Sequence, residues 1–167
     1  MASQFSTNMP KTEREKLAAM IRRVRLFSNF TPLDMENIGN YLSLRKVSAG
    51  ETIFKEGDND MEMYFVAKGR VNVVKESPDS STSITTIIEG QSMGEMSMLD
   101  TMPYSATVMA ETDCCLLVLG RDRYDSLLKN YPKLGNKLLS QLARLMSVRL
   151  RLTTGMLVSI SSKNASL

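Results

Sequence analysis

Hydrophobic residues are spaced in two different ways along the chain. Between residues 12 and 25 they recur every three or four positions, as on one face of an α-helix, at Leu17, Met20, Ile21 and Val24. Thr31-Pro32 then opens a second, short helix, with proline at its first helical position. This pattern predicts a helical N-terminal extension over residues 1–25 and a further short helix at the entry to the main domain.

From Leu44 to Leu119 the spacing is that of short β-strands. Brief apolar runs are separated by turns rich in glycine, serine and charged residues, and they cover residues 44–47, 52–54, 61–67, 71–74, 84–88, 106–110 and 114–119. Strands this short, with turns this frequent, are typical of a β-barrel or jelly roll. We therefore expect a mainly β fold with flanking helices, in which residues 26–131 form a jelly-roll barrel. The metal-enzyme version of such a barrel needs histidine ligands, and the chain contains no histidine.

A long helix is predicted from Lys133 onward, within a C-terminal segment of residues 132–167. Four- and three-residue steps alternate along it, as in the seam of a two-helix contact, at Leu138, Leu142, Leu145, Arg149, Leu152 and Met156. A second apolar stripe, at Leu139, Met146 and Leu150, would face the barrel. We expect the seam to form a homodimer, and packing against the chain's own N-terminal helix is the alternative. A dry interface disfavours Arg149, so this residue should face a polar group of the ligand or of a partner.

Residues 90–108 interrupt the strands with a glycine-rich turn and one short helix. They read GQSMGEMSMLDTMPYSATV. The unpaired backbone N–H groups at the start of a helix suit an anion. Glu95 can accept hydrogen bonds from sugar hydroxyls, and Ser105 adds a hydroxyl donor. This stretch is therefore the candidate ligand site.

The same stretch resembles the phosphate-binding cassette of the cyclic-nucleotide-binding domain family, of the type found as the effector domain of the catabolite activator protein. The residues in register with the family pattern are Gly94, Glu95, Ser97, Met98, Pro103, Ser105, Ala106 and Thr107. The order of turns and strands from Ala49 to Val71 is also similar to the family's barrel. The resemblance covers about residues 26–145.

The resemblance implies a cyclic nucleotide as ligand, cAMP or cGMP, with no further cofactor and no metal. In the family the cassette glutamate holds the ribose 2′-hydroxyl, which is the role implied for Glu95. The implied ligand-binding set comprises cassette residues and one residue of the long helix: Met93, Gly94, Glu95, Met96, Ser97, Pro103, Tyr104, Ser105, Ala106 and Arg149.

Tyr104 occupies the position of the family's arginine, which neutralises the cyclic phosphate. Loss of one forked, charge-assisted contact costs about 2–5 kcal/mol of binding free energy. We therefore expect weak binding of ordinary cyclic mononucleotides. Binding would be stronger if Tyr104 donates in place of the arginine, or if Arg149 or Arg121 supplies the positive charge.

The remaining features exclude several function classes. No nucleophile–base pair, metal cluster or Walker-type loop occurs, so we do not expect an enzyme. No apolar run reaches the ~18 residues that span a bilayer, and the N-terminus lacks a signal-type core, which predicts a cytoplasmic protein. The segment after the long helix is too short for a helix-turn-helix domain, so no DNA-binding domain is expected. The basic residues of the N-terminal helix are interpreted as a solvated face.

Two function classes remain. The first is a stand-alone, homodimeric regulatory domain that senses a nucleotide second messenger and acts on a downstream protein partner. The second is a barrel that serves as a protein-interaction or scaffold module, or that binds a different nucleotide such as a cyclic dinucleotide. Glu95 and Ser105 favour the first class, and Tyr104 favours the second.

Overall fold

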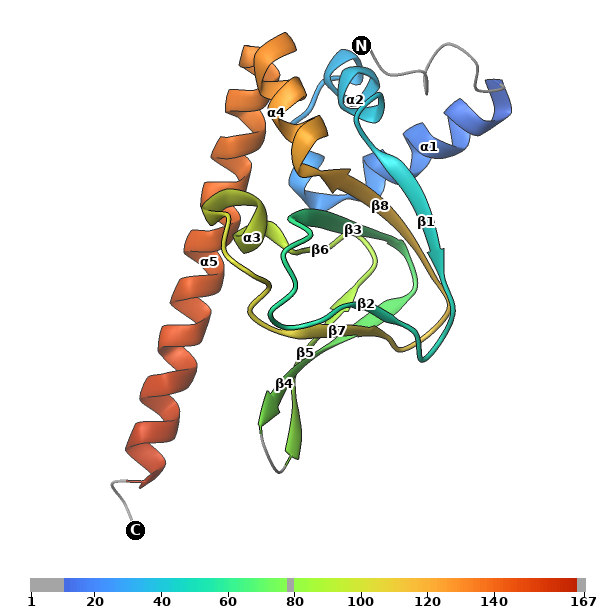
Figure 1. The fold of residues 1–167 in the computed structure, drawn as a ribbon. Coiled ribbons are helices and arrows are strands. Elements are labelled where there is room, and N and C mark those ends of the chain that lie inside the picture. Colours follow the sequence, from blue (N-terminus) through green and yellow to red (C-terminus); the bar gives the residue numbers. More distant parts are fainter. Residues whose placement is uncertain (1–10, 78–79, 165–167) are drawn as a thin grey trace.

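The computed structural model describes residues 11–77 and 80–164. Within these ranges the strands form two four-stranded antiparallel sheets, in the orders β1-β8-β3-β6 and β2-β7-β4-β5 (Figure 1). The strands are β1 (Ser43–Val47), β2 (Thr52–Phe54), β3 (Glu62–Lys68), β4 (Arg70–Ser77), β5 (Ser80–Ile88), β6 (Ser92–Met93), β7 (Thr107–Ala110) and β8 (Cys114–Gly120). The helices are α1 (Lys11–Arg23), the 3-10 helix η1 (Arg25–Phe27), α2 (Pro32–Gly39), α3 (Glu95–Asp100), α4 (Arg121–Asn130) and α5 (Pro132–Asn164). The expected mainly β fold with flanking helices and a long C-terminal helix is confirmed.

Strands β3 and β8 are buried on both of their faces. Along β3, Met63 and Phe65 belong to the core under the helices, whereas Tyr64 and Val66 belong to the core between the sheets. This alternation follows from the two-residue period of a strand. It explains why both segments read as continuous apolar runs rather than as alternating ones.

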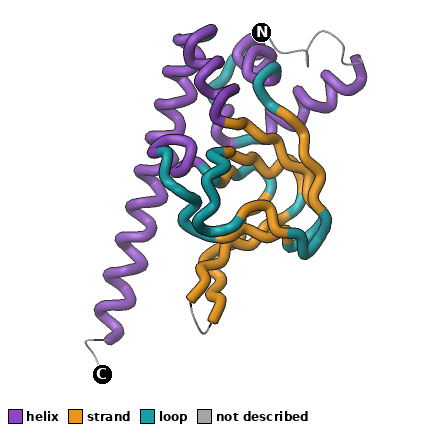
Figure 2. Tube along the Cα trace, viewed as in Figure 1, coloured by secondary structure: helices purple, strands orange, loops and turns teal. Residues whose placement is uncertain are grey.

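The helices cover the outer face of the β1-β8-β3-β6 sheet, and α5 extends beyond them (Figure 2). Helix α2 begins after Thr31, as predicted, and Thr31 and Asp34 form a capping box there. The Thr31 hydroxyl accepts from the backbone N–H of Asp34, and the Asp34 carboxylate accepts from the backbone N–H of Thr31. A salt bridge of 2.7 Å between Lys137 and Asp34 then joins α5 to α2.

The β4–β5 hairpin is longer than its apolar residues indicate. Strand β5 begins at Ser80, although only residues 84–88 read as a strand in the sequence. Its serines and threonines pair with β4 as far as the register Ser77↔Ser80. Strand β5 lies at the end of its sheet, so its polar side chains are tolerated there.

The two halves of α5 differ in their packing. Leu134, Leu138 and Leu142 are fully buried against the body of the protein. From Arg151 to Ser159 every residue is exposed. The first part of the expected dimer seam therefore packs within the chain, and Leu150, which we expected to face the barrel, is 68% exposed.

We predict opposite effects of alanine at the two glycines of α5. A Cβ at Gly135 would lie 2.5 Å from Leu128 Cδ2 and 3.2 Å from Leu128 Cα, whereas a Cβ at Gly155 meets nothing within 4 Å. Gly155→Ala should raise the free energy of unfolding by up to about 1 kcal/mol through helix propensity. Gly135→Ala should lower it by about 1–3 kcal/mol through overpacking. Urea unfolding of both variants measures this, and a stabilised Gly135→Ala would contradict the close α4–α5 contact.

Candidate functional site

Gly94 links β6 to α3 in a backbone conformation that only glycine adopts easily. Its φ of 80° lies in the left-handed region. A Cβ at this position would also lie 2.4 Å from the carbonyl oxygen of Glu62. The backbone conformation and the close contact with Glu62 both require glycine here. The start of α3 can therefore lie directly against the beginning of β3.

Glu95, the first residue of α3, is only 2% exposed and both of its carboxylate oxygens are bound. Ser92 Oγ donates to Oε1, and Arg149 Nη1 donates to Oε2 at 2.9 Å. Arg149 Nη2 donates to the backbone carbonyl of Ser92 at 2.7 Å. The guanidinium therefore spans two adjacent acceptors, one on β6 and one on α3, and ties α5 to the cassette. Arg149 faces polar groups, as expected, but they belong to Glu95 and Ser92 of this chain rather than to a ligand or a partner.

Tyr104 lies inside the barrel and is 3% exposed. Its ring stacks on Phe54, with 3.9 Å between the ring centroids. Its hydroxyl donates to the backbone carbonyl of Glu62 and accepts from the backbone N–H of the same residue, both at 2.8 Å. Burial raises the pKa of Tyr104 to about 12, so the hydroxyl stays protonated at neutral pH. Because its proton is directed to Glu62, this hydroxyl does not face an anion at the cassette.

The other predicted site residues are spread over the surface and the interior of the cassette. Met93 and Ser97 are buried, Ala106 is half-buried, and Met96, Pro103 and Ser105 are exposed. Ser105 Oγ lies 4.0 Å from Met96 Sδ, and the Ser105 carbonyl accepts from Lys75 Nζ at 2.7 Å. The structure thus brings Glu95 together with Arg149, and Ser105 together with Met96.

Sequence reasoning missed three residues that contact the site. Ser92 and Glu62 form hydrogen bonds through both their backbone and their side chains, and no sequence motif identifies them. Lys75 lies on β4, far from the cassette in sequence. Only the strand pairing between β4 and β7 reveals that Lys75 approaches Ser105.

Arg121 is engaged at the other end of α3. Its Nη1 donates to the carbonyl of Met98 at 2.8 Å, and its Nε pairs with Asp125 at 3.1 Å. A cation at the C-terminal end of a helix is favourable because the last carbonyls lack partners. Arg121 therefore holds α3 in place from its far end.

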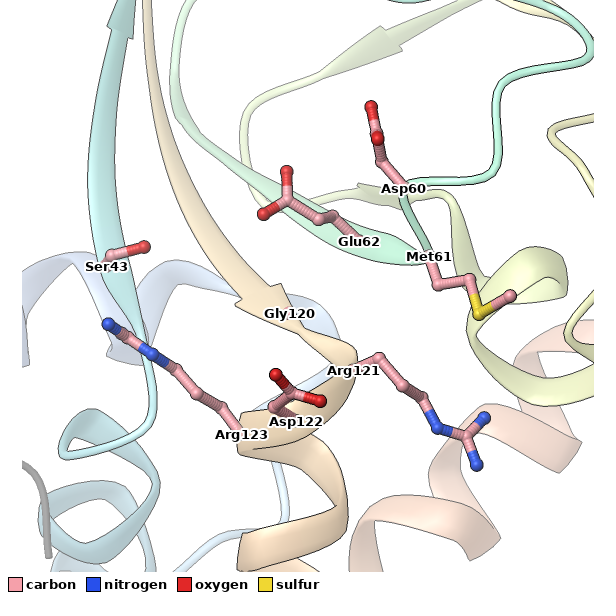
Figure 3. Close-up of a pocket in the computed structure, with 8 residues that line it drawn as sticks. All are labelled: Ser43, Asp60, Met61, Glu62, Gly120, Arg121, Asp122 and Arg123. Atoms are coloured by element: carbon pink, nitrogen blue, oxygen red, sulfur yellow. The ribbon is translucent and has the colours of Figure 1, made fainter. Parts of the chain in front are cut away.

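A cavity of about 470 Å³ lies at the start of α4 (Figure 3). Its lining residues carry charges of both signs: Ser43, Asp60, Met61, Glu62, Gly120, Arg121, Asp122 and Arg123. None of the predicted ligand-binding residues lines it. Glu62 connects the two regions, because its backbone holds the Tyr104 hydroxyl and its carboxylate accepts from Tyr64 at 2.6 Å.

Within residues 11–77 and 80–164, no group of three or more His, Cys, Asp or Glu residues is arranged to hold a metal ion. In the same ranges no helix has the length and apolar character needed to cross a bilayer.

Comparison with known proteins identifies the family. The model of the cyclic nucleotide-binding domain matches residues 44–131. The chain belongs to this family. It is 31% identical over 120 residues to the cyclic AMP receptor protein of Thermus thermophilus, covering 71% of this chain and 56% of that protein. It is also 30% identical over 115 residues to the regulatory subunit of cAMP-dependent protein kinase from Aspergillus niger, covering 69% of this chain and 28% of that subunit.

A solved structure supports the same assignment. A cyclic nucleotide-binding domain from Methylobacillus flagellatus superposes with a TM-score of 0.77 at 30% identity, covering 88% of this chain and 83% of that one. The curated relatives named above are longer, and the chain spans about half or less of their length. The shared part is thus the nucleotide-binding domain itself.

We predict that Tyr104→Phe destabilises the fold. The substitution leaves the backbone N–H and carbonyl of Glu62 without their partner in a buried place, which should lower the free energy of unfolding by about 1–3 kcal/mol. Tyr131→Phe is the matched control, because the Tyr131 ring is partly exposed, and its effect should stay within about 0.5 kcal/mol. Chemical denaturation measures both variants, and equal stabilities would show that the Tyr104 hydroxyl is dispensable.

Proposed function

We propose that the chain is a non-catalytic regulatory domain that binds a cyclic nucleotide at α3 and passes the binding event to α5. One observation carries this proposal. The Glu95 carboxylate lies at the start of α3, inside the cassette, and is held by Arg149 from α5. The ligand-binding element and the long helix therefore meet at a single buried charge.

A ribose hydroxyl that binds Glu95 has to share the carboxylate with Ser92 and Arg149, or replace one of them. A carboxylate offers about four lone-pair sites, so sharing is chemically feasible. In either case the strength of the Arg149 contact changes when the ligand binds. Because coupling is reciprocal, the position of α5 must also influence the affinity for the ligand.

Tyr104 sets the expected affinity. It replaces the cation that pairs with the cyclic phosphate in the family, and its hydroxyl is bound to Glu62. Arg149 and Arg121 are likewise engaged, with Glu95 and with Met98 and Asp125. We therefore propose that cAMP or cGMP binds weakly to this conformation.

The exposed half of α5 supports a homodimer. Six large apolar side chains of α5 are more than half exposed: Val148, Leu150, Leu152, Met156, Leu157 and Val158. Val148, Leu152 and Met156 follow one another at four-residue steps, so they form one exposed apolar stripe. Such a stripe normally contacts another helix or protein. A second copy of the chain offers the same surface, as a two-fold contact requires.

A second candidate function is a protein-interaction module without nucleotide binding. The Tyr104–Glu62 hydrogen bonds favour this function, because Tyr104 then stabilises the fold and offers no donor to a nucleotide phosphate. In this case the exposed half of α5 would be the interaction surface.

We predict that Glu95→Gln weakens binding of cAMP and cGMP by about 1–2 kcal/mol, the value of a hydrogen bond to a charged group. Glu111→Gln is the control, because Glu111 pairs with Arg70 on the surface and should have no effect. Calorimetric titration of both variants and of the wild type measures the loss. If the wild type binds neither nucleotide at millimolar concentration, the interaction module becomes the better reading.

We predict that Leu152→Glu combined with Met156→Glu produces monomers from a wild-type dimer. Both residues are exposed in the single chain, so the change introduces like charges only into the proposed interface. Leu33→Glu is the control, because Leu33 is equally exposed on α2 and lies outside α5. Sedimentation equilibrium at micromolar concentration gives the mass of each species. A monomeric wild type would rule out the dimer.

A further inference from the structure

Lys75 lies where the end of β4 passes the second half of the cassette. Strands β4 and β7 pair in register, so that Val73 is opposite Val108, and both pack in the core between the sheets. Side chains two residues apart share a face of a strand. Lys75 therefore lies on the same face of β4 as Val73, at the rim of the barrel, and its side chain is 47% exposed.

The Lys75 ammonium joins two segments of the candidate site. Its Nζ donates to the backbone carbonyl of Ser105 at 2.7 Å and to Glu56 Oε1 at 2.6 Å. Ser105 directly follows Tyr104, and the backbone N–H of Gly57 donates to the Tyr104 carbonyl at 2.9 Å. The ammonium is thus held next to the position at which the family places its arginine.

Glu56, the salt-bridge partner of Lys75, uses only one of its two carboxylate oxygens in that contact. Its Oε2 is buried and has no hydrogen-bond partner among the described residues. A second carboxylate, Glu76, lies nearby and accepts from the Thr107 hydroxyl at 3.3 Å. Thr107 also accepts from the backbone N–H of Glu56 at 3.0 Å. Glu56 holds Lys75 at the rim, and both carboxylates lower the local positive charge.

We infer that Lys75 supplies the positive charge for the phosphate of a ligand bound at the cassette, with Glu56 as its counter-ion in the absence of ligand. A lysine can play this part because its ammonium is a point charge on a flexible stem, and a small rotation moves it from one anion to another. The assignment rests on the proposed function, since it presumes that a phosphate binds beside Ser105. Lys75 differs in this from Arg121 and Arg149, whose guanidinium groups bind residues of α3 and β6.

The inference predicts opposite effects at two neighbouring residues. Lys75→Gln should weaken cAMP binding by about tenfold, and it should leave binding of adenosine, which lacks the phosphate, within about twofold. Glu56→Gln removes the competing negative charge and should strengthen cAMP binding by roughly threefold. Lys46→Gln is the matched control, because it removes the same charge from an exposed position on β1. Calorimetric titration of all four proteins gives these ratios.

A second measurement tests whether Lys75 binds phosphate even if the chain does not bind a cyclic nucleotide. The unfolding midpoint is compared in inorganic phosphate and in chloride, at matched pH and ionic strength, for the wild type, Lys75→Gln and Lys46→Gln. Phosphate should raise the midpoint of the wild type and of Lys46→Gln but not that of Lys75→Gln. If this holds while the wild type binds no cyclic nucleotide, the proposed function fails and the role of Lys75 stands.

Three outcomes would overturn the role of Lys75. The first is equal cAMP affinity in Lys75→Gln and the wild type, which leaves the proposed function intact. The second is an equal loss of affinity for cAMP and adenosine, and the third is a phosphate effect on the unfolding midpoint that Lys75→Gln does not change. Lys75 would then only position the loop around Ser105.

Discussion

The burial of β3 and β8 on both faces is the constraint on which the rest of the structure depends. One face of these strands lines the interior of the barrel, so the other must be covered by helices. The first half of α5 provides part of this cover and is therefore fixed against the body. That placement carries Arg149 to Glu95 and leaves residues 151–159 exposed. The position of the site and the exposed helix thus have the same origin.

The cassette of residues 90–108 keeps the family's backbone pattern although Tyr104 stands where the family has an arginine. An arginine at position 104 would need an anion or a carboxylate nearby, since a buried lone charge is costly. Tyrosine instead fills the space with its ring and satisfies the backbone of Glu62 with its hydroxyl. The same hydrogen bonds that stabilise β3 against the cassette remove a donor from the ligand. Tyr104 is therefore part of the folded core, and its hydroxyl is already engaged by the backbone of Glu62.

The sequence predicted the parts of this molecule that depend on local pattern. The strand segments, the helix start at Thr31-Pro32 and the turn at Gly94 follow from periodicity, from a proline suited to the first helical position and from a glycine that other residues replace only with strain. It did not predict that Leu138 and Leu142 pack inside the chain, because a heptad spacing does not say which surface it meets. It also did not predict the contacts of Tyr104 or Lys75. Those depend on Glu62, Glu56 and Ser105, which only the strand pairing brings close.

Helix α5 is fixed along its first half and exposed along its second half, so a small change in its angle moves its far end the most. Its buried half is held by the hydrophobic core and by Lys137, and Arg149 binds Glu95 further along the helix. The part beyond Arg149 is about 22 Å long at 1.5 Å per residue. A tilt of about 10° at that point displaces the far end by about 4 Å, which is more than the length of a hydrogen bond. A small change of angle at Arg149 is therefore enlarged along the exposed part of the helix.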